Sequence, residues 1–151
     1  MLCITGGTMF LLQRICNKEE GVIMIIEIDF NSDEAIYIQL RNQIVMGIAT
    51  EQLHTGESLP SVRQLASNLG VNMHTVNKAY GILRQEGYLT LDRRKGAVIS
   101  VQTKEKNQEV EAMNMELRMT IAQAICKDIS REEMYHIINQ LYDEIMKNQE
   151  E

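Results

Sequence analysis

The tightest constraint on the fold comes from one segment near the middle of the chain, LPSVRQLASNLGVNMHTVNKAYGILRQEGYLTL. Pro60 disfavours a helix at the residue before it, and Ser61 followed three residues later by Gln64 is a capping-box pattern. Apolar residues then recur at helical spacing until Gly70, which is placed to end the helix in the left-handed conformation. We therefore predict two short helices joined by a tight turn.

The second helix of this pair is predicted to begin after Asn72, a favoured N-cap residue, and to end at Gly87. Its apolar residues follow the helical pattern and are Val76, Ala79, Tyr80 and Leu83. The opposite face is polar and free of acid, and it carries His74, Lys78, Gly81 and Gln85. Such a face suits insertion into the major groove of DNA, although a polar face on a single amphipathic helix is more often simply solvated.

Strand patterns flank the helices. The runs YLTL and AVISV predict a β-hairpin whose connection is residues 92–96. Upstream, MIIEIDF predicts a short strand from Met24, and Asn31, Ser32 and Asp33 supply N-cap chemistry for a long amphipathic helix that ends near Leu53. The order helix, helix, tight turn, helix, hairpin describes a winged helix–turn–helix. The predicted fold is mainly α with a small β-hairpin wing.

The sign of the charge changes along the chain, although the whole has a formal net charge of -6. Residues 1–53 carry 3 basic and 7 acidic side chains, residues 54–104 carry 7 and 3, and residues 105–151 carry 5 and 11. A basic middle between acidic ends is expected where one local surface meets a polyanion. Chance clustering of charge remains an alternative for this feature alone.

Composition argues against several classes of protein. Cys3, Cys16 and Cys126 are too few and too scattered for a disulfide framework, and free thiols indicate a reducing, cytoplasmic setting. No Cys/His spacing fits a metal, so neither a metal nor a cofactor is expected. No apolar run reaches the roughly 20 residues of a membrane span, so no membrane partner is expected.

Residues 1–23 lack the basic leader and the small-residue cleavage site of a signal peptide. Codons for Lys18 to Gly21 can spell a ribosome-binding sequence, and Met24 follows at a plausible initiation distance. We predict that residues 1–23 are a non-native or disordered leader, or add an adventitious helix or strand. Translation is expected to begin at Met24, which the intact mass of the native product decides.

The segment LPSVRQLASNLGVNMHTVNKAYGILRQEGYLTLDRRKGAVI resembles the N-terminal winged-helix domain of GntR-family bacterial transcription regulators. The run from Asn72 to Tyr80 has the form found in the YtrA subfamily, as do Tyr37, Gln39 and Leu40 further upstream. The resemblance covers about half of the chain. It implies sequence-specific binding to double-stranded DNA by residues 24–103.

The resemblance also implies roles for residues at matching positions. Arg63 stands where the second helix contacts the DNA backbone or a guanine edge, and Gly96 stands at the wing tip, where backbone approaches the minor groove. The full set of residues expected at the DNA is Ser61, Arg63, Asn72, Met73, His74, Thr75, Asn77, Lys78, Arg93, Arg94, Lys95 and Gly96. Target preference does not transfer, because Met73 and His74 depart from residues common in the family.

The last third, residues 104–151, predicts two amphipathic helices. Three- and four-residue spacing links Val110, Met113, Leu117, Ile121 and Ala124, and then Met134, Ile137, Ile138, Leu141 and Ile145. Ser130 and Glu133 form another capping box between them. Two helices cannot enclose a ligand pocket, so we expect them to pack against a second copy as a dimerisation tail. A small-molecule surface on the Met-rich stripe is the alternative, although methionines at helical spacing more often belong to a core.

These observations predict a homodimeric DNA-binding regulator on a palindromic operator, with two recognition helices about 34 Å apart. The subfamily resemblance implies a repressor of its own operon, often one that encodes an ABC-type transporter. The sequence does not indicate which small-molecule effector, if any, the protein binds. The alternative is a non-specific architectural DNA-binding or protein-interaction module. An enzyme is not expected, because His54, His74 and His136 lie in separate elements without nucleophile or paired-carboxylate partners.

Overall fold

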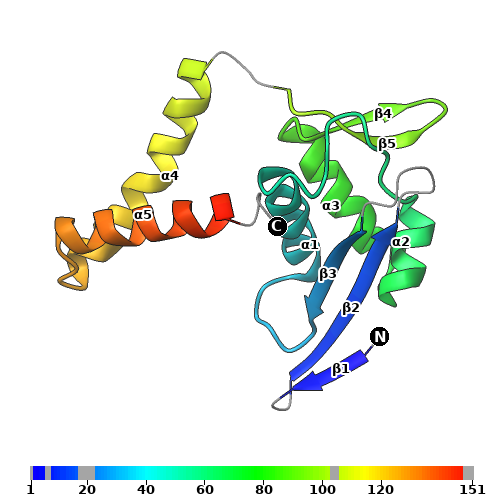
Figure 1. The fold of residues 1–151 in the computed structure, drawn as a ribbon, viewed down its shortest axis with the longest axis horizontal. Coiled ribbons are helices and arrows are strands. Elements are labelled where there is room, and N and C mark those ends of the chain that lie inside the picture. The colour runs from blue at the N-terminus through cyan, green and yellow to red at the C-terminus, as the bar shows by residue number, and fades with distance from the viewer. Residues whose placement is uncertain (1, 6–7, 17–22, 103–105, 148–151) are drawn as a thin grey trace. The chain divides into compact units, whose positions relative to one another are not determined.

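The computed structural model describes residues 2–5, 8–16, 23–102 and 106–147. It has five helices and a small antiparallel hairpin wing, as predicted, beside a further three-stranded sheet (Figure 1). Two compact units divide between Val101 and Gln102. The elements of the first unit are β1 (Leu2–Thr5), β2 (Thr8–Cys16), β3 (Ile23–Asp29), α1 (Ile36–Ala49), α2 (Val62–Leu69), α3 (Met73–Gln85), β4 (Leu89–Asp92) and β5 (Gly96–Ile99).

The three-stranded sheet is antiparallel in the order β1-β2-β3, and Leu11 of β2 pairs with Ile28 of β3. In β3 the side chains alternate, so that Ile26 and Ile28 are buried while Ile25 is about half exposed. The strand predicted from Met24 onward is therefore present. Strands β1 and β2 fall within residues 1–23, and the predicted start at Met24 and domain boundaries stay predictions.

Helix α1 is fastened to β3 by two glutamine side chains. The buried Gln39 amide accepts from the Asp29 N–H at 2.9 Å and donates to the carbonyls of Asp29 and Glu34 at 2.9 and 2.8 Å. Gln43 accepts from the Glu27 N–H at 2.8 Å and donates to the carbonyl of the same residue. A buried amide with all these partners is fully compatible with the core, so Gln39 fixes the position of α1 on the sheet.

The predicted start and end of this helix were wrong by a few residues. Its N-cap is Ala35, which makes no side-chain cap bond, because the Ser32 hydroxyl instead accepts from the Glu34 N–H at 3.1 Å in the preceding turn. The helix ends at Ala49 rather than near Leu53, and Glu51 follows with a left-handed φ of 57°. Turn chemistry before the helix and a left-handed residue after it therefore shorten the element.

The core of the first unit lies where α1, α2 and α3 meet the base of the wing. Its fully buried side chains include Leu40 and Ile44 of α1, Leu65 and Leu69 of α2, Val76 and Leu83 of α3, and Ile99 of β5. Tyr80 also faces inward, and its hydroxyl donates to the Pro60 carbonyl at 2.9 Å. Burial raises the pKa of Tyr80 well above its ordinary value, so the phenol stays neutral.

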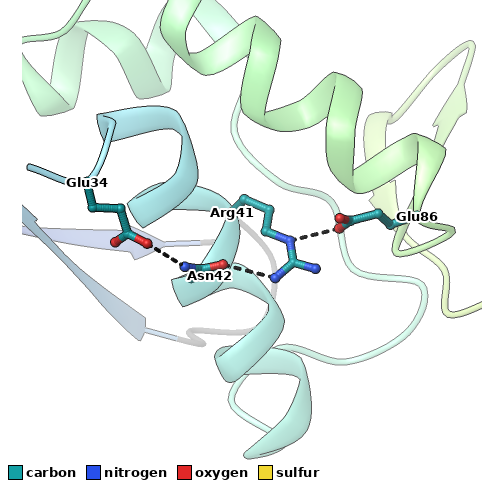
Figure 2. A network of polar contacts seen from close by, with 4 residues as sticks. All are labelled: Glu34, Arg41, Asn42 and Glu86. Carbon is teal, nitrogen blue, oxygen red and sulfur yellow. Dashed lines mark hydrogen bonds and ion pairs between the residues drawn. The ribbon is translucent and has the colours of Figure 1, made fainter. Parts of the chain in front are cut away.

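A polar network crosses the surface between α1 and α3, as Figure 2 shows. Arg41 Nε donates to the Glu86 carboxylate at 2.8 Å, and Arg41 Nη1 donates to Asn42 Oδ1 at 2.9 Å. Asn42 in turn donates to Glu34 at 3.0 Å. The Arg41–Glu86 pair is partly exposed, so it orients the C-terminal end of α3 more than it adds to stability.

The second unit contains α4 (Lys106–Cys126) and α5 (Arg131–Lys147), which diverge from the turn between them (Figure 1). The Ser130 hydroxyl accepts from the Glu133 N–H at 3.2 Å, and the Glu133 carboxylate accepts from the Ser130 N–H at 2.8 Å, so the predicted capping box is confirmed. The hydrogen bonds that the Ser130 N–H and then the Ser130 hydroxyl donate to its carboxylate lower the pKa of Glu133. Across the described residues, no helix combines the length and the apolar character that spanning a bilayer requires.

We expect the substitution Gly70→Ala to lower the free energy of unfolding by about 1–2 kcal/mol, because Gly70 holds a left-handed φ of 62° that alanine adopts with strain. Urea denaturation measures the change. Gly70→Asn is the matched control and should cost less, since asparagine tolerates this conformation. An alanine variant as stable as the parent would show that the turn does not need the left-handed residue.

Candidate nucleic-acid interface

The N-terminus of α3 is built by Asn72, whose side-chain oxygen accepts from the His74 N–H at 2.8 Å. The helix buries Val76, Ala79, Tyr80 and Leu83 against the core, as the sequence predicted. Its outer face is therefore fixed, and the first turn of the helix contains no acidic residue. Exposed N–H groups at a helix N-terminus, with the helix dipole behind them, favour an anionic partner such as phosphate.

The predicted contact residues of α3 are brought together on this outer face. Asn72, Met73, His74, Asn77 and Lys78 are exposed, and Thr75 is half buried. Met73 is 47% exposed. The structure thus groups these six residues at the surface.

The Lys78 ammonium group lies over the ring of Tyr37 in α1, 3.7 Å from the ring centroid. At that distance the ring attracts the cation and restricts the lysine side chain to one side of α3. The sequence did not predict this contact, because Tyr37 and Lys78 lie in different helices. Tyr37 is therefore a residue that positions one of the predicted DNA contacts.

Helix α2 precedes α3 through the turn at Gly70. The Ser61 hydroxyl accepts from the Gln64 N–H at 3.2 Å, and Gln64 Oε1 accepts from the Ser61 N–H at 3.4 Å, which confirms the capping box. The Ser61 hydroxyl is thus already engaged in the protein. The side chain of Arg63, one residue into the helix, is exposed and has no ion pair or hydrogen bond to the described residues.

The wing tip is a tight turn held by Asp92. Its carboxylate accepts from the N–H groups of Arg94 and Lys95 at 2.7 and 2.8 Å, and Gly96 follows with φ of 79°. The hydrogen bonds from Lys95 and then Arg94, together with the nearby Lys95 charge, lower the pKa of Asp92. The side chains of Arg93, Arg94 and Lys95 are exposed, so the wing presents three cations around one ordered carboxylate.

The base of the wing is tied to the loop before α2. Leu59 N–H donates to the Ala97 carbonyl, and Gly56 and Glu57 exchange backbone hydrogen bonds with Ile99, each at 2.8 Å. The loop therefore runs along β5 almost as a third strand. As a result, the start of α2, the helix α3 and the wing meet around one hollow, which residues of all three line.

Comparison with known proteins identifies this arrangement. The sequence model described as "Bacterial regulatory proteins, gntR family" matches residues 34–99, and the solved structure of YtrA from Sulfolobus acidocaldarius, a GntR-family transcription factor, is 41% identical. That structure aligns with 68% of this chain and 99% of its own, with a TM-score of 0.56. The chain belongs to the GntR family.

Two further proteins are similar to this chain. The transcriptional repressor YtrA of Bacillus subtilis is 38% identical over 80 residues, which make up 53% of this chain and 62% of that protein. A structure titled as a transcriptional antiterminator from Listeria monocytogenes EGD-e superposes with a TM-score of 0.71 at 27% identity, over 79% of this chain and 90% of its own. This GntR protein is thus a YtrA-like, DNA-binding transcription regulator rather than an enzyme, as the sequence predicted.

Acidification is expected to loosen the wing tip of this GntR protein. Because the folded pKa of Asp92 is depressed, its hydrogen bonds are present above the ordinary aspartate value of about 3.9 and are lost as the pH falls through the lower folded value. In an NMR titration, the Arg94 and Lys95 amide signals should move together with that low pKa. Asp92→Asn, which keeps an acceptor, should abolish the titration while leaving the turn ordered. Arg94 and Lys95 amide signals that do not change with pH in the parent protein would contradict this account.

Proposed function

We propose that this protein is a cytoplasmic homodimeric repressor that binds a palindromic operator in its own operon, and that the operon encodes an ABC-type transporter. The observation that carries the DNA-binding part is the acid-free, N-capped outer face of α3, which lies beside a wing tip with three exposed cations. Side chains at the start of such a helix reach base edges in the major groove, while cations nearby neutralise phosphates. The name of the Bacillus subtilis relative supports the choice of a repressor.

In this proposal the exposed groups divide between two tasks. His74, Asn77 and Met73 face bases, because they stand in the first turns of α3. Arg63, Lys78 and the wing-tip residues contact phosphates, because they carry charge at the edges of that face. The remaining predicted residues support them: Asn72 and Ser61 cap helices, Thr75 lies between the two groups, and Gly96 shapes the wing tip.

The dimer is supported by the apolar surface of the tail. Among residues 108–147, whose side chains the structure describes, Ala124 alone is buried, while Leu117 and Ile121 are 40% and 46% exposed. Met115 and Met119, which lie on the other side of α4, are 71% and 65% exposed. Apolar side chains thus lie on two opposite sides of α4, separated by polar residues such as Glu116, and in this proposal the side with Leu117 packs against a second copy of the chain.

We expect Arg63→Ala and Lys78→Ala each to weaken operator binding about tenfold at physiological salt, because each variant removes a cation that would neutralise a phosphate. The salt dependence should also become less steep, by about 0.9 for each phosphate that is no longer neutralised. Fluorescence anisotropy on a duplex that the parent selects from a random pool gives both values. Arg131→Ala, which removes the same charge from the first turn of α5, is the control.

Two outcomes of that experiment would contradict the proposal in different ways. Parent-like affinity of both variants would show that the assigned surface is wrong. A preference of the parent for its selected duplex over random competitor DNA far below about a thousandfold would favour a non-specific architectural protein.

Leu117→Glu is expected to convert the protein to a monomer, since it places a charge on an apolar face that a dimer would bury. Sedimentation equilibrium should report the monomer mass, and operator affinity should fall because two linked half-sites become one. Gln123→Glu adds the same charge on the side of α4 that carries Glu116 and should remain dimeric. A dimeric Leu117→Glu variant would place the interface elsewhere.

A further inference from the structure

A hollow lies between α3 and the wing. Asn77, Gly81 and Arg84 of α3 form one wall, and Thr90 and Leu91 of β4 form the other. Its volume of about 150 Å³ is below the roughly 300 Å³ at which small-molecule pockets begin. The hollow is therefore too small to enclose an ordinary organic effector.

Gly81 lines this hollow and has open space beside it. A Cβ built on Gly81 would meet no atom within 4 Å, and the residue lies in regular helix, so neither packing nor backbone conformation requires glycine there. Glycine in the middle of a helix is unfavourable relative to alanine. A glycine at this position leaves that space free for a bound molecule.

The other walls supply the groups that such an occupant would meet. The Arg84 guanidinium is exposed and has no hydrogen bond or ion pair within the described residues. Thr90 brings a neutral donor to the same hollow, and Leu91, which is 65% exposed, brings an apolar surface. One unpaired cation, one neutral donor and an apolar contact suit a phosphodiester with its attached deoxyribose.

We propose that this hollow holds the sugar–phosphate backbone of the DNA strand that separates the two grooves, with Arg84 on the phosphate and Gly81 as the point of close approach. The inference rests on the proposed function, in which α3 enters the major groove and the cations of the wing tip contact phosphates beyond it, across the adjacent minor groove. Adjacent grooves of a duplex are divided by one backbone strand. That strand must therefore cross between α3 and β4, where the hollow lies.

The test uses the full chain and the duplex that the parent selects from a random pool. Gly81→Ala should weaken binding about tenfold and at the same time raise the midpoint of thermal unfolding, because the new methyl group blocks the backbone while alanine favours the helix. Arg84→Ala should weaken binding about tenfold on every sequence alike and make the salt slope shallower by about 0.9, the value for one phosphate left without its cation. Arg131→Ala is again the charge-matched control.

Replacement of single phosphates by neutral methylphosphonates then locates the contact. One position per half-site should weaken the parent but cause no further loss in Arg84→Ala. If the parent binds its selected duplex but Gly81→Ala and Arg84→Ala bind equally well, and no phosphate loses its effect in Arg84→Ala, the hollow is not a backbone site although the proposed function stands. A parent that selects no duplex would instead overturn the proposed function itself.

Discussion

The packing of one face of α3 against α1 and α2 determines which residues of that helix lie on the proposed DNA-binding surface. Val76 and Leu83 have no exposed surface, and Leu65 and Leu69 of α2 are equally buried. Truncation of one such leucine to alanine typically costs about 2–5 kcal/mol, a large part of the stability of a small domain. Because that face cannot turn outward, the face with His74, Asn77 and Lys78 cannot turn inward. The apolar residues of α3 thus determine by exclusion which of its residues are exposed to a partner.

Local signals in the sequence predicted this half of the molecule well, because they act within a few residues. The capping box at Ser61, the cap at Asn72 and the left-handed Gly70 all have the predicted bonds or backbone angles. They succeed because each depends on the geometry of one helix end. The prediction of the start of α1 was wrong because several residues with N-cap chemistry lie in a row there. The Ser32 hydroxyl accepts a hydrogen bond in the turn before the helix begins.

Contacts between elements could not be predicted in this way. The position of Lys78 over Tyr37, the Arg41–Glu86 pair and the hollow beside Gly81 all depend on how helices cross and where the wing folds back. The sequence predicted which face of α3 is exposed, but it did not predict which residues of other elements restrain the side chains on that face. In the tail, the three- and four-residue spacing located α4, whereas the exposure of Met115 and Met119 on its far side emerged only from the structure.

The hydrogen bonds that join residues 56–59 to β5 have a consequence for how such a protein changes its target. These hydrogen bonds join the wing to the start of α2, which leads into α3. Backbone geometry, and not side chains, therefore sets the distance from α3 to the wing tip. A mutation on the outer surface changes which side chains face a partner, but it does not change the distance between α3 and the wing tip. Divergence among descendants of this chain should therefore proceed by the exchange of surface residues, while the distance from α3 to the wing tip stays constant.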